Sequence, residues 1–106
     1  MAPLLLWMER NLGQDLSLSM IARHARTSTR TLSRRFRVQV GMTPAQWLGK
    51  ARVRRVRHLL EATRLSIERI AVEVGFGSAS VLREHFGSVV GISPTAYRHW
   101  FRGSRY

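Results

Sequence analysis

The residues best suited to chemistry are hydrogen-bond donors spaced at helical intervals between residues 29 and 37. Arg30, Arg34 and Arg37 recur at intervals of four and three residues, so a helix would carry them on one face together with Ser33. No acidic residue lies among them. Arginine presents a planar set of donors that matches phosphate oxygens and the edge of guanine. The pattern therefore predicts a surface that binds a polyanion.

The charge of the chain favours the same class of partner. Eighteen basic residues against six acidic ones give a formal net charge of +12. No acidic residue occurs between Asp15 and Glu61, where most of the arginines lie. A run of like charge is often only a solvated face, but an unbalanced one destabilises the compact state by self-repulsion. We therefore favour a nucleic-acid partner over a role in solubility alone.

The second half of the chain repeats the first. Residues 16–22 match residues 65–71, and residues 41–44 match residues 91–94, about 50 residues later in the chain. The spacing changes by one residue in between, at a turn containing Arg26. This predicts two copies of one small unit, each a short helix, a turn and a second helix.

Local signals predict where the helices begin and end. Four serines stand where a side-chain hydroxyl can accept hydrogen bonds from the first turn of a helix. These serines are Ser17, Ser28, Ser66 and Ser78. Residues 43–46, Thr-Pro-Ala-Gln, form a capping box with proline at the first helical position. Gly13, Gly41 and Gly91 are expected to end helices.

The expected fold class is all-α, with seven helices and no sheet. The helices are expected at about residues 4–12, 18–25, 29–40, 44–62, 67–74, 79–90 and 94–101, followed by a loose tail over residues 103–106. The first helix-turn-helix unit then covers about residues 17–41 and the second about residues 66–91, joined by the long helix 44–62, with a last helix at 94–101. All lie in one domain, residues 1–106.

In a helix-turn-helix unit the second helix needs an apolar inner face and a polar outer face, which it lays in the major groove of DNA. Leu32, Phe36 and Val40 form the inner face in the first unit, opposite the arginines. Leu82, Phe86 and Val90 form it in the second unit. The tryptophans Trp7, Trp47 and Trp100 lie among apolar residues and are expected to anchor the cores.

The outer face of the second unit is much less basic. The positions that correspond to Thr29, Arg30, Ser33, Arg34 and Arg37 are Ala79, Ser80, Arg83, Glu84 and Gly87. A glutamate can accept from a cytosine amino group, but Glu84 is more readily explained by an ion pair with Arg83. We therefore expect unequal halves, with the first giving most of the affinity and most of the base contacts.

Residues 75–80, Leu82, Phe86 and residues 91–98 together resemble the signature of the AraC/XylS family of bacterial transcription regulators. The resemblance covers nearly the whole chain. It implies the family's C-terminal DNA-binding domain, with seven helices and two helix-turn-helix units joined by a long central helix. The second repeat also resembles the subgroup whose N-terminal domain is of the DJ-1/PfpI type.

The resemblance also implies a set of DNA-binding residues. Base-facing positions fall on Thr29, Arg30, Ser33 and Arg34 in the first unit and on Ala79, Ser80, Arg83 and Glu84 in the second. Phosphate contacts are expected from Arg26, Arg35, Arg37 and Arg98. The family commonly has arginine where Glu84 stands, and this departure argues against strong base reading by the second unit.

Double-stranded DNA is the implied partner, with RNA polymerase as a further candidate, in the bacterial cytoplasm. We expect two recognition helices in successive major-groove segments, the first dominant. Regulators of this family normally carry an N-terminal sensing or dimerisation domain, so the chain is expected to be a fragment that lacks it. Activation and repression stay open.

Other functions are less well supported by the sequence. The four histidines show no metal-ligand spacing and the chain has no cysteine, so no metal site is expected. The carboxylates are too scattered for acid–base catalysis, and we expect neither an enzyme nor a cofactor. A nonspecific nucleic-acid or RNA binder would not need duplicated two-faced helices, and a membrane-surface protein would need its apolar faces exposed.

Overall fold

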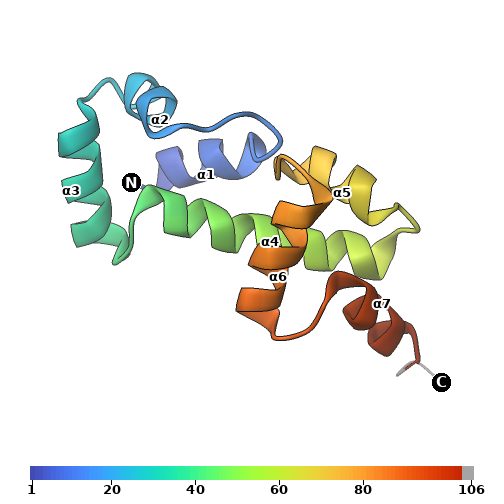
Figure 1. Ribbon diagram of the computed structural model, residues 1–106. Helices are drawn as coiled ribbons and strands as arrows, with labels where there is room; N and C mark the ends of the chain where they lie inside the picture. Colours follow the sequence, from blue (N-terminus) through green and yellow to red (C-terminus); the bar gives the residue numbers. More distant parts are fainter. Residues whose placement is uncertain (104–106) are drawn as a thin grey trace. The chain divides into compact units, whose positions relative to one another are not determined.

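The computed structural model describes residues 1–103, which form seven α-helices and no strand (Figure 1). The helices are α1 (Ala2–Arg10), α2 (Leu18–His24), α3 (Thr29–Val40), α4 (Pro44–Ala62), α5 (Ile67–Val74), α6 (Ala79–Val90) and α7 (Pro94–Gly103). The chain divides into two compact units, Met1–Ala51 and the part from Arg52 onward. The all-α class and the two helix-turn-helix units, α2–α3 and α5–α6, are confirmed.

The predicted serine caps are all present. Each serine Oγ accepts a hydrogen bond from a main-chain amide three residues later, at 3.1–3.2 Å. The pairs are Ser17 with Met20, Ser28 with Thr31, Ser66 with Arg69 and Ser78 with Val81. Thr43 and Gln46 exchange reciprocal side-chain to main-chain bonds at the start of α4. These contacts satisfy amides that have no partner within the helix.

The helix ends at Gly41 and Gly91 also match the prediction. Both glycines adopt the left-handed region, with φ of 84° and 92°, which a residue with a Cβ enters only at a cost. The prediction for α1 is wrong at both ends, since the helix covers Ala2–Arg10 and not residues 4–12. It ends before Gly13 because Asn11 stands at the C-cap and its Nδ2 donates to the carbonyl of Trp7 at 2.7 Å.

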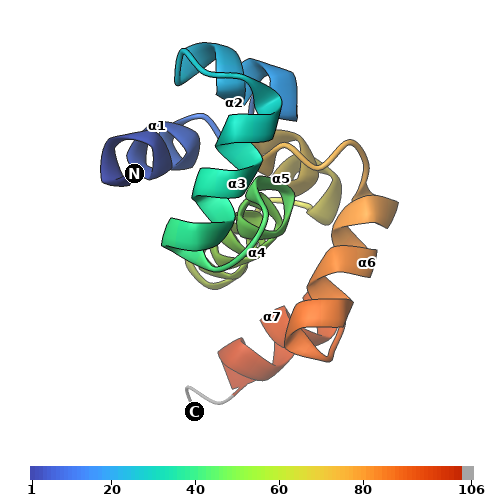
Figure 2. The same cartoon turned by 90° about the vertical axis from the view of Figure 1, so that its left-hand side faces the viewer.

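The core of the first unit is built from α1, α2, α3 and the beginning of α4 (Figure 2). Phe36 is completely buried, and its ring makes an edge contact with the half-buried Trp47 at a centroid distance of 6.5 Å. Trp7 stacks on His24 with ring centroids 3.8 Å apart. The predicted inner-face residues Leu32 and Phe36 therefore fix α3 by one side only, which leaves the opposite side to solvent.

The second unit packs α5, α6 and α7 on the remainder of α4. Phe86 is completely buried and meets Tyr97 of α7 edge-on, at a centroid distance of 5.6 Å. The expectation that Trp100 anchors this core is wrong, because its side chain is 63% exposed. Phe101, one residue later and one turn beyond Tyr97, packs against the core in its place. The helix α7 runs to Gly103, past the predicted end, and the rest of the predicted tail lies outside the described residues.

A hydrogen-bonded group ties α7 to the end of α4 within the second unit. The Tyr97 hydroxyl donates to a carboxylate oxygen of Glu61, and Arg57 Nε donates to Tyr97 Oη at 3.5 Å. The hydrogen bond to Tyr97 raises the pKa of Arg57, as do the nearby charges of Tyr97 and Glu61.

No described helix is long and apolar enough to cross a membrane.

Candidate nucleic-acid interface

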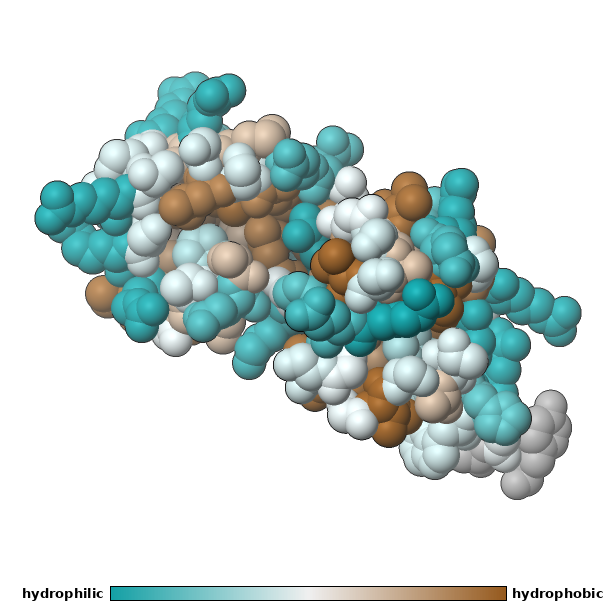
Figure 3. Space-filling view, viewed as in Figure 1, coloured by the Kyte–Doolittle hydropathy of each residue, from teal (hydrophilic) through white to brown (hydrophobic). Residues whose placement is uncertain are grey.

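The exposed face of α3 carries the donors that the sequence placed there. Thr29, Arg30, Arg34 and Arg37 are exposed and Ser33 is half-buried, while Leu32 on the opposite side is buried. The left edge of Figure 3, where α3 lies in the same view of Figure 1, is lined with hydrophilic side chains. Within residues 1–103 neither Arg30 nor Arg34 forms an ion pair. Their guanidinium groups are therefore available to a ligand.

The N-terminal turn of α3 is held by side-chain contacts. Ser28 Oγ accepts from the Thr31 amide at 3.1 Å and is also hydrogen-bonded to Thr31 Oγ1 at 2.9 Å. These bonds fix the turn that carries Thr29 and Arg30. In recognition helices in general, the N-terminal turn is the part that contacts base edges. A rigid turn lowers the entropy cost of placing those side chains against a ligand.

Arg26 lies in the turn between α2 and α3 and is exposed. Its backbone is left-handed, with φ of 55°, the one non-glycine residue in this region among the described residues. The same place in the second unit is occupied by Gly75, with φ of 89°. An L residue in this conformation costs roughly 1 kcal/mol or more, so Arg26 lowers the stability of the fold relative to a glycine at this position.

Arg35 lies beside the arginine face and not on it. Its side chain lines a surface hollow together with Met1, Leu4 and Gln39. It is exposed, as is Arg37. The structure thus separates Arg35 from Arg30 and Arg34, as the helical spacing predicted.

The outer face of α6 is different in kind. Ser80, Arg83 and Glu84 are exposed, but Ala79 is half-buried and packs against the core of its unit. The expected ion pair between Glu84 and Arg83 is absent, and this prediction is corrected. Arg83 Nη2 lies 3.6 Å from Glu68 Oε1 on α5, and Glu84 forms no ion pair with any described residue. The sequence alone favours a partner on the same helix, but the packing of α5 on α6 places the Glu68 carboxylate beside Arg83.

Arg98 has a structural role within its own unit, and its contact with phosphate stays a prediction. Its Nε donates to Leu60 O at 3.2 Å, Nη1 to Leu65 O at 2.7 Å and Nη2 to Thr63 O at 3.3 Å. Partial burial lowers the pKa of Arg98, and the nearby charge of Arg102 lowers it further. Arg98 closes the C-terminal end of α4, where carbonyls lack helical partners. The sequence could not show this because the acceptors are more than 30 residues away.

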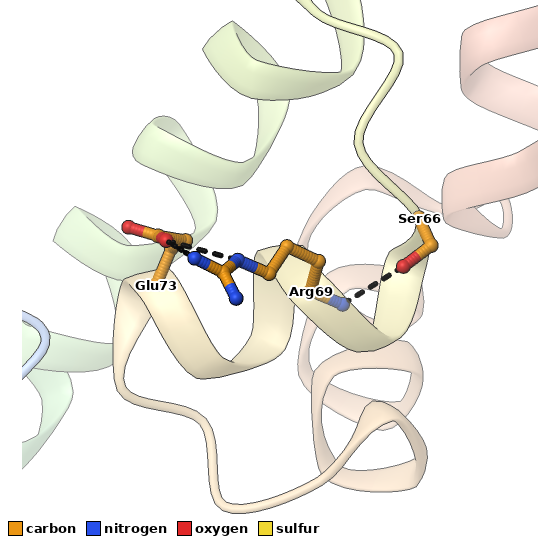
Figure 4. Close-up of polar contacts among 3 residues, drawn as sticks. All are labelled: Ser66, Arg69 and Glu73. Atoms are coloured by element: carbon orange, nitrogen blue, oxygen red, sulfur yellow. Dashed lines mark hydrogen bonds and ion pairs between the residues drawn. The ribbon is translucent and has the colours of Figure 1, made fainter.

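The sequence reasoning also missed Glu68, which faces the outer side of α6. The one local signal at Glu68 is its place in the first turn of α5, where a carboxylate interacts favourably with the helix dipole. The other acidic residue of α5, Glu73, pairs with Arg69 of the same helix at 3.1 Å (Figure 4).

Within residues 1–103, no cluster of three or more histidine, cysteine or acidic side chains is placed to hold a metal ion.

Known proteins resemble this chain in sequence. The Helix-turn-helix domain family matches residues 21–99. The activator AarP of Providencia stuartii is 35% identical over 90% of this chain and 70% of its own length. The uncharacterised HTH-type transcriptional regulator YfiF of Bacillus subtilis (strain 168) is 34% identical over 90% of this chain. This chain spans 30% of the length of YfiF and of several other relatives.

Solved structures resemble it closely in fold. The DNA-binding domain of AdpA, solved in complex with a target DNA, superposes with a TM-score of 0.95 and 38% identity, over 98% of this chain and 94% of that chain. An AraC-type regulator from Chromobacterium violaceum gives a TM-score of 0.84 with 30% identity, over 92% of this chain and 88% of that one. The chain therefore belongs to the AraC family of helix-turn-helix transcription regulators, whose DNA-binding domain it contains.

Proposed function

We propose that this domain recognises a specific duplex DNA sequence mainly through α3, while α6 makes weaker contacts to an adjacent segment. One observation carries this proposal. The helix α3 is buried on one side at Leu32 and Phe36, and on the other it displays three arginines and no acid. A rigid, two-faced helix of this kind suits the major groove.

Direct base contacts are assigned to Thr29, Arg30, Ser33 and Arg34. Arginine pairs in a bidentate manner with O6 and N7 of guanine, and a good pair gives about 1–3 kcal/mol of discrimination between bases. Ser33 and Thr29 can hydrogen-bond to several bases. Because Arg30 and Arg34 are one helical turn apart, they address neighbouring positions along the groove.

Phosphate contacts are assigned to Arg26, Arg35 and Arg37. All three arginines are exposed: Arg26 and Arg35 lie beside the face that carries Arg30 and Arg34, and Arg37 lies on that face toward the C-terminal end of α3. Contacts to phosphate fix the register of a protein on the duplex without reading its sequence. They would also supply most of the salt-sensitive affinity.

The second unit is assigned a smaller share of recognition. Ser80, Arg83 and Glu84 are exposed on α6, but Arg83 already has a carboxylate partner and Glu84 would be repelled by phosphate. Ala79 offers only a methyl group and is half-buried. We therefore propose that α6 contacts mainly the DNA backbone.

Further partners are proposed from the relatives. AarP is named a transcriptional activator, so RNA polymerase is the natural second partner for a regulator built on this domain. We also predict a sensing or dimerisation domain in the regulator that contains this DNA-binding domain. In one subgroup of the family, that additional domain is of the DJ-1/PfpI type. A cytoplasmic, DNA-associated location follows from the proposed function.

The proposal is tested by selecting duplexes from a random pool with this chain. The selected duplex and a scrambled duplex of equal length and composition are then compared at several salt concentrations. We expect the selected duplex to bind about a thousandfold more tightly. Equal affinity for both duplexes, or preference for single-stranded RNA, would overturn the proposal in favour of nonspecific nucleic-acid binding.

A further inference from the structure

Glu68 contacts the arginine on the outer face of α6. The Glu68 carboxylate and the Arg83 guanidinium approach to 3.6 Å, and their side chains are 70% and 49% exposed. Glu68 belongs to the first turn of α5, the first helix of its helix-turn-helix unit. That helix crosses the DNA backbone in units of this kind. The carboxylate and its partner thus lie at the surface that would approach phosphates.

The first unit has no such contact. The repeat places Ser19 where α5 has Glu68, and Ser33 where α6 has Arg83. Both are uncharged. Among the described residues, the arginines of α3 at positions 30 and 34 have no carboxylate partner from the helix before them. The two units therefore differ in one respect: an arginine of α6 forms an ion pair with a carboxylate of its own unit, whereas Arg30 and Arg34 of α3 do not.

Resting on the proposed DNA-binding function, we propose that Glu68 restrains the second unit by holding Arg83 in an ion pair that DNA phosphates must displace. Phosphate and carboxylate both bind the N–H groups of a guanidinium, so a phosphate and Glu68 compete for the same donors of Arg83. Glu68 thereby limits sequence-independent affinity and leaves recognition to α3.

The expected size of the effect follows from the exposure of the pair. Exposed ion pairs contribute little, and breaking one in advance should improve affinity by about two- to fivefold. Removing any acidic charge also strengthens binding to a polyanion, so this general effect needs a control. Glu73 provides it, because it lies on the same helix and pairs with Arg69, not with Arg83 (Figure 4).

The experiment compares Glu68→Gln with Glu73→Gln at one low salt concentration. The probes are the duplex selected from the random pool and its scrambled counterpart. Both variants lose one negative charge from α5. We expect Glu68→Gln to bind both duplexes about two- to fivefold more tightly than Glu73→Gln does. We also expect this difference in affinity to vanish when each substitution is made separately in an Arg83→Gln background.

Circular dichroism of each variant shows whether its total helical content is unchanged. Equal affinities for the two variants, a gain confined to the selected duplex, or a difference that persists without Arg83 would each overturn the restraint. A parent chain without preference for the selected duplex would overturn the proposed function itself. The two failures are thus distinguished by the parent measurement alone.

Discussion

Arginine has at least three roles in this domain, and the surroundings of each side chain decide which. Arg30 and Arg34 are exposed with no ion pair among residues 1–103, Arg83 pairs with an exposed carboxylate, and Arg98 donates to three main-chain carbonyls. Sequence spacing separates the first role from the others, because the helical period alone predicts a shared face. It cannot separate the last two, since Glu68 and the carbonyls are brought in by packing.

At the residue scale, we expect the arginines of α3 to divide between base and phosphate. Arg30→Ala or Arg34→Ala should cost about 1–3 kcal/mol of binding and relax the preference at one or two positions. Arg35→Ala should weaken binding to all sequences alike, because it lies beside the reading face. Competition with single-position variants of the selected duplex measures both effects. Three variants with lower affinity and unchanged preference would contradict the division.

Arg98 should matter for the stability of the second unit. Arg98→Met removes donors from the carbonyls of Leu60, Thr63 and Leu65, and the free energy of unfolding should fall by about 1–3 kcal/mol. The matched control is Arg30→Met, which removes an exposed arginine and should change stability by less than about 0.5 kcal/mol. Urea unfolding measures both. An unfolding midpoint for Arg98→Met equal to that of the parent would refute the structural role.

At the element scale, the helices of this chain are specified by short-range signals. The caps at Ser28 and Ser78 and the left-handed Gly41 and Gly91 each bond to groups within four residues of their own position, so the sequence predicts the bounds of α3 and α6 correctly. The error at α1 has the same cause. Asn11 ends that helix through its own side chain, an alternative to glycine that competes locally.

The same scale explains why the outer face of α6 could be predicted only in part. Its exposed positions follow from the period of Leu82 and Phe86, both buried as expected. The partner of Arg83 does not, because it comes from α5. Ala79 is half-buried and packs against the core of its unit, whereas Thr29 of α3 is exposed, and the contact of Ala79 with DNA stays a prediction.

We expect Glu84→Arg to strengthen binding to duplexes in general. The substitution removes an exposed carboxylate without an ion-pair partner among the described residues and adds a donor for phosphate. The gain should be similar for the selected and the scrambled duplex, because phosphate contacts carry no sequence information. Titrations with both duplexes measure it. A gain in affinity for one duplex together with a loss for the other would assign base reading to Glu84.

At the scale of the whole molecule, the net charge of +12 is the feature that sequence alone conveyed best. It indicated a polyanionic partner, and the family assignment agrees with that inference. The structure shows which of the arginines are exposed and which are bonded within the protein. The arginines around α3 are exposed, whereas Arg98 and Arg102 are turned toward carbonyls of their own unit.

Phosphate contacts should dominate the affinity of the domain. If about six phosphates are neutralised, binding should weaken by roughly a thousandfold between about 50 and 200 mM salt. The slope of the logarithm of affinity against the logarithm of salt concentration measures this number. Arg35→Ala should reduce the slope by about one unit, whereas a nearly flat titration of the parent would contradict the electrostatic account.

The inequality of the two helix-turn-helix units is the central claim, and footprinting on the selected duplex tests it most directly. Hydroxyl-radical cleavage reports protection of the backbone at each nucleotide. We predict one strongly protected segment beside a weaker one, with Arg30→Ala altering the strong segment. Equal protection of both segments, together with a Glu84→Arg variant that loses all sequence preference in one of them, would show that both units specify the sequence.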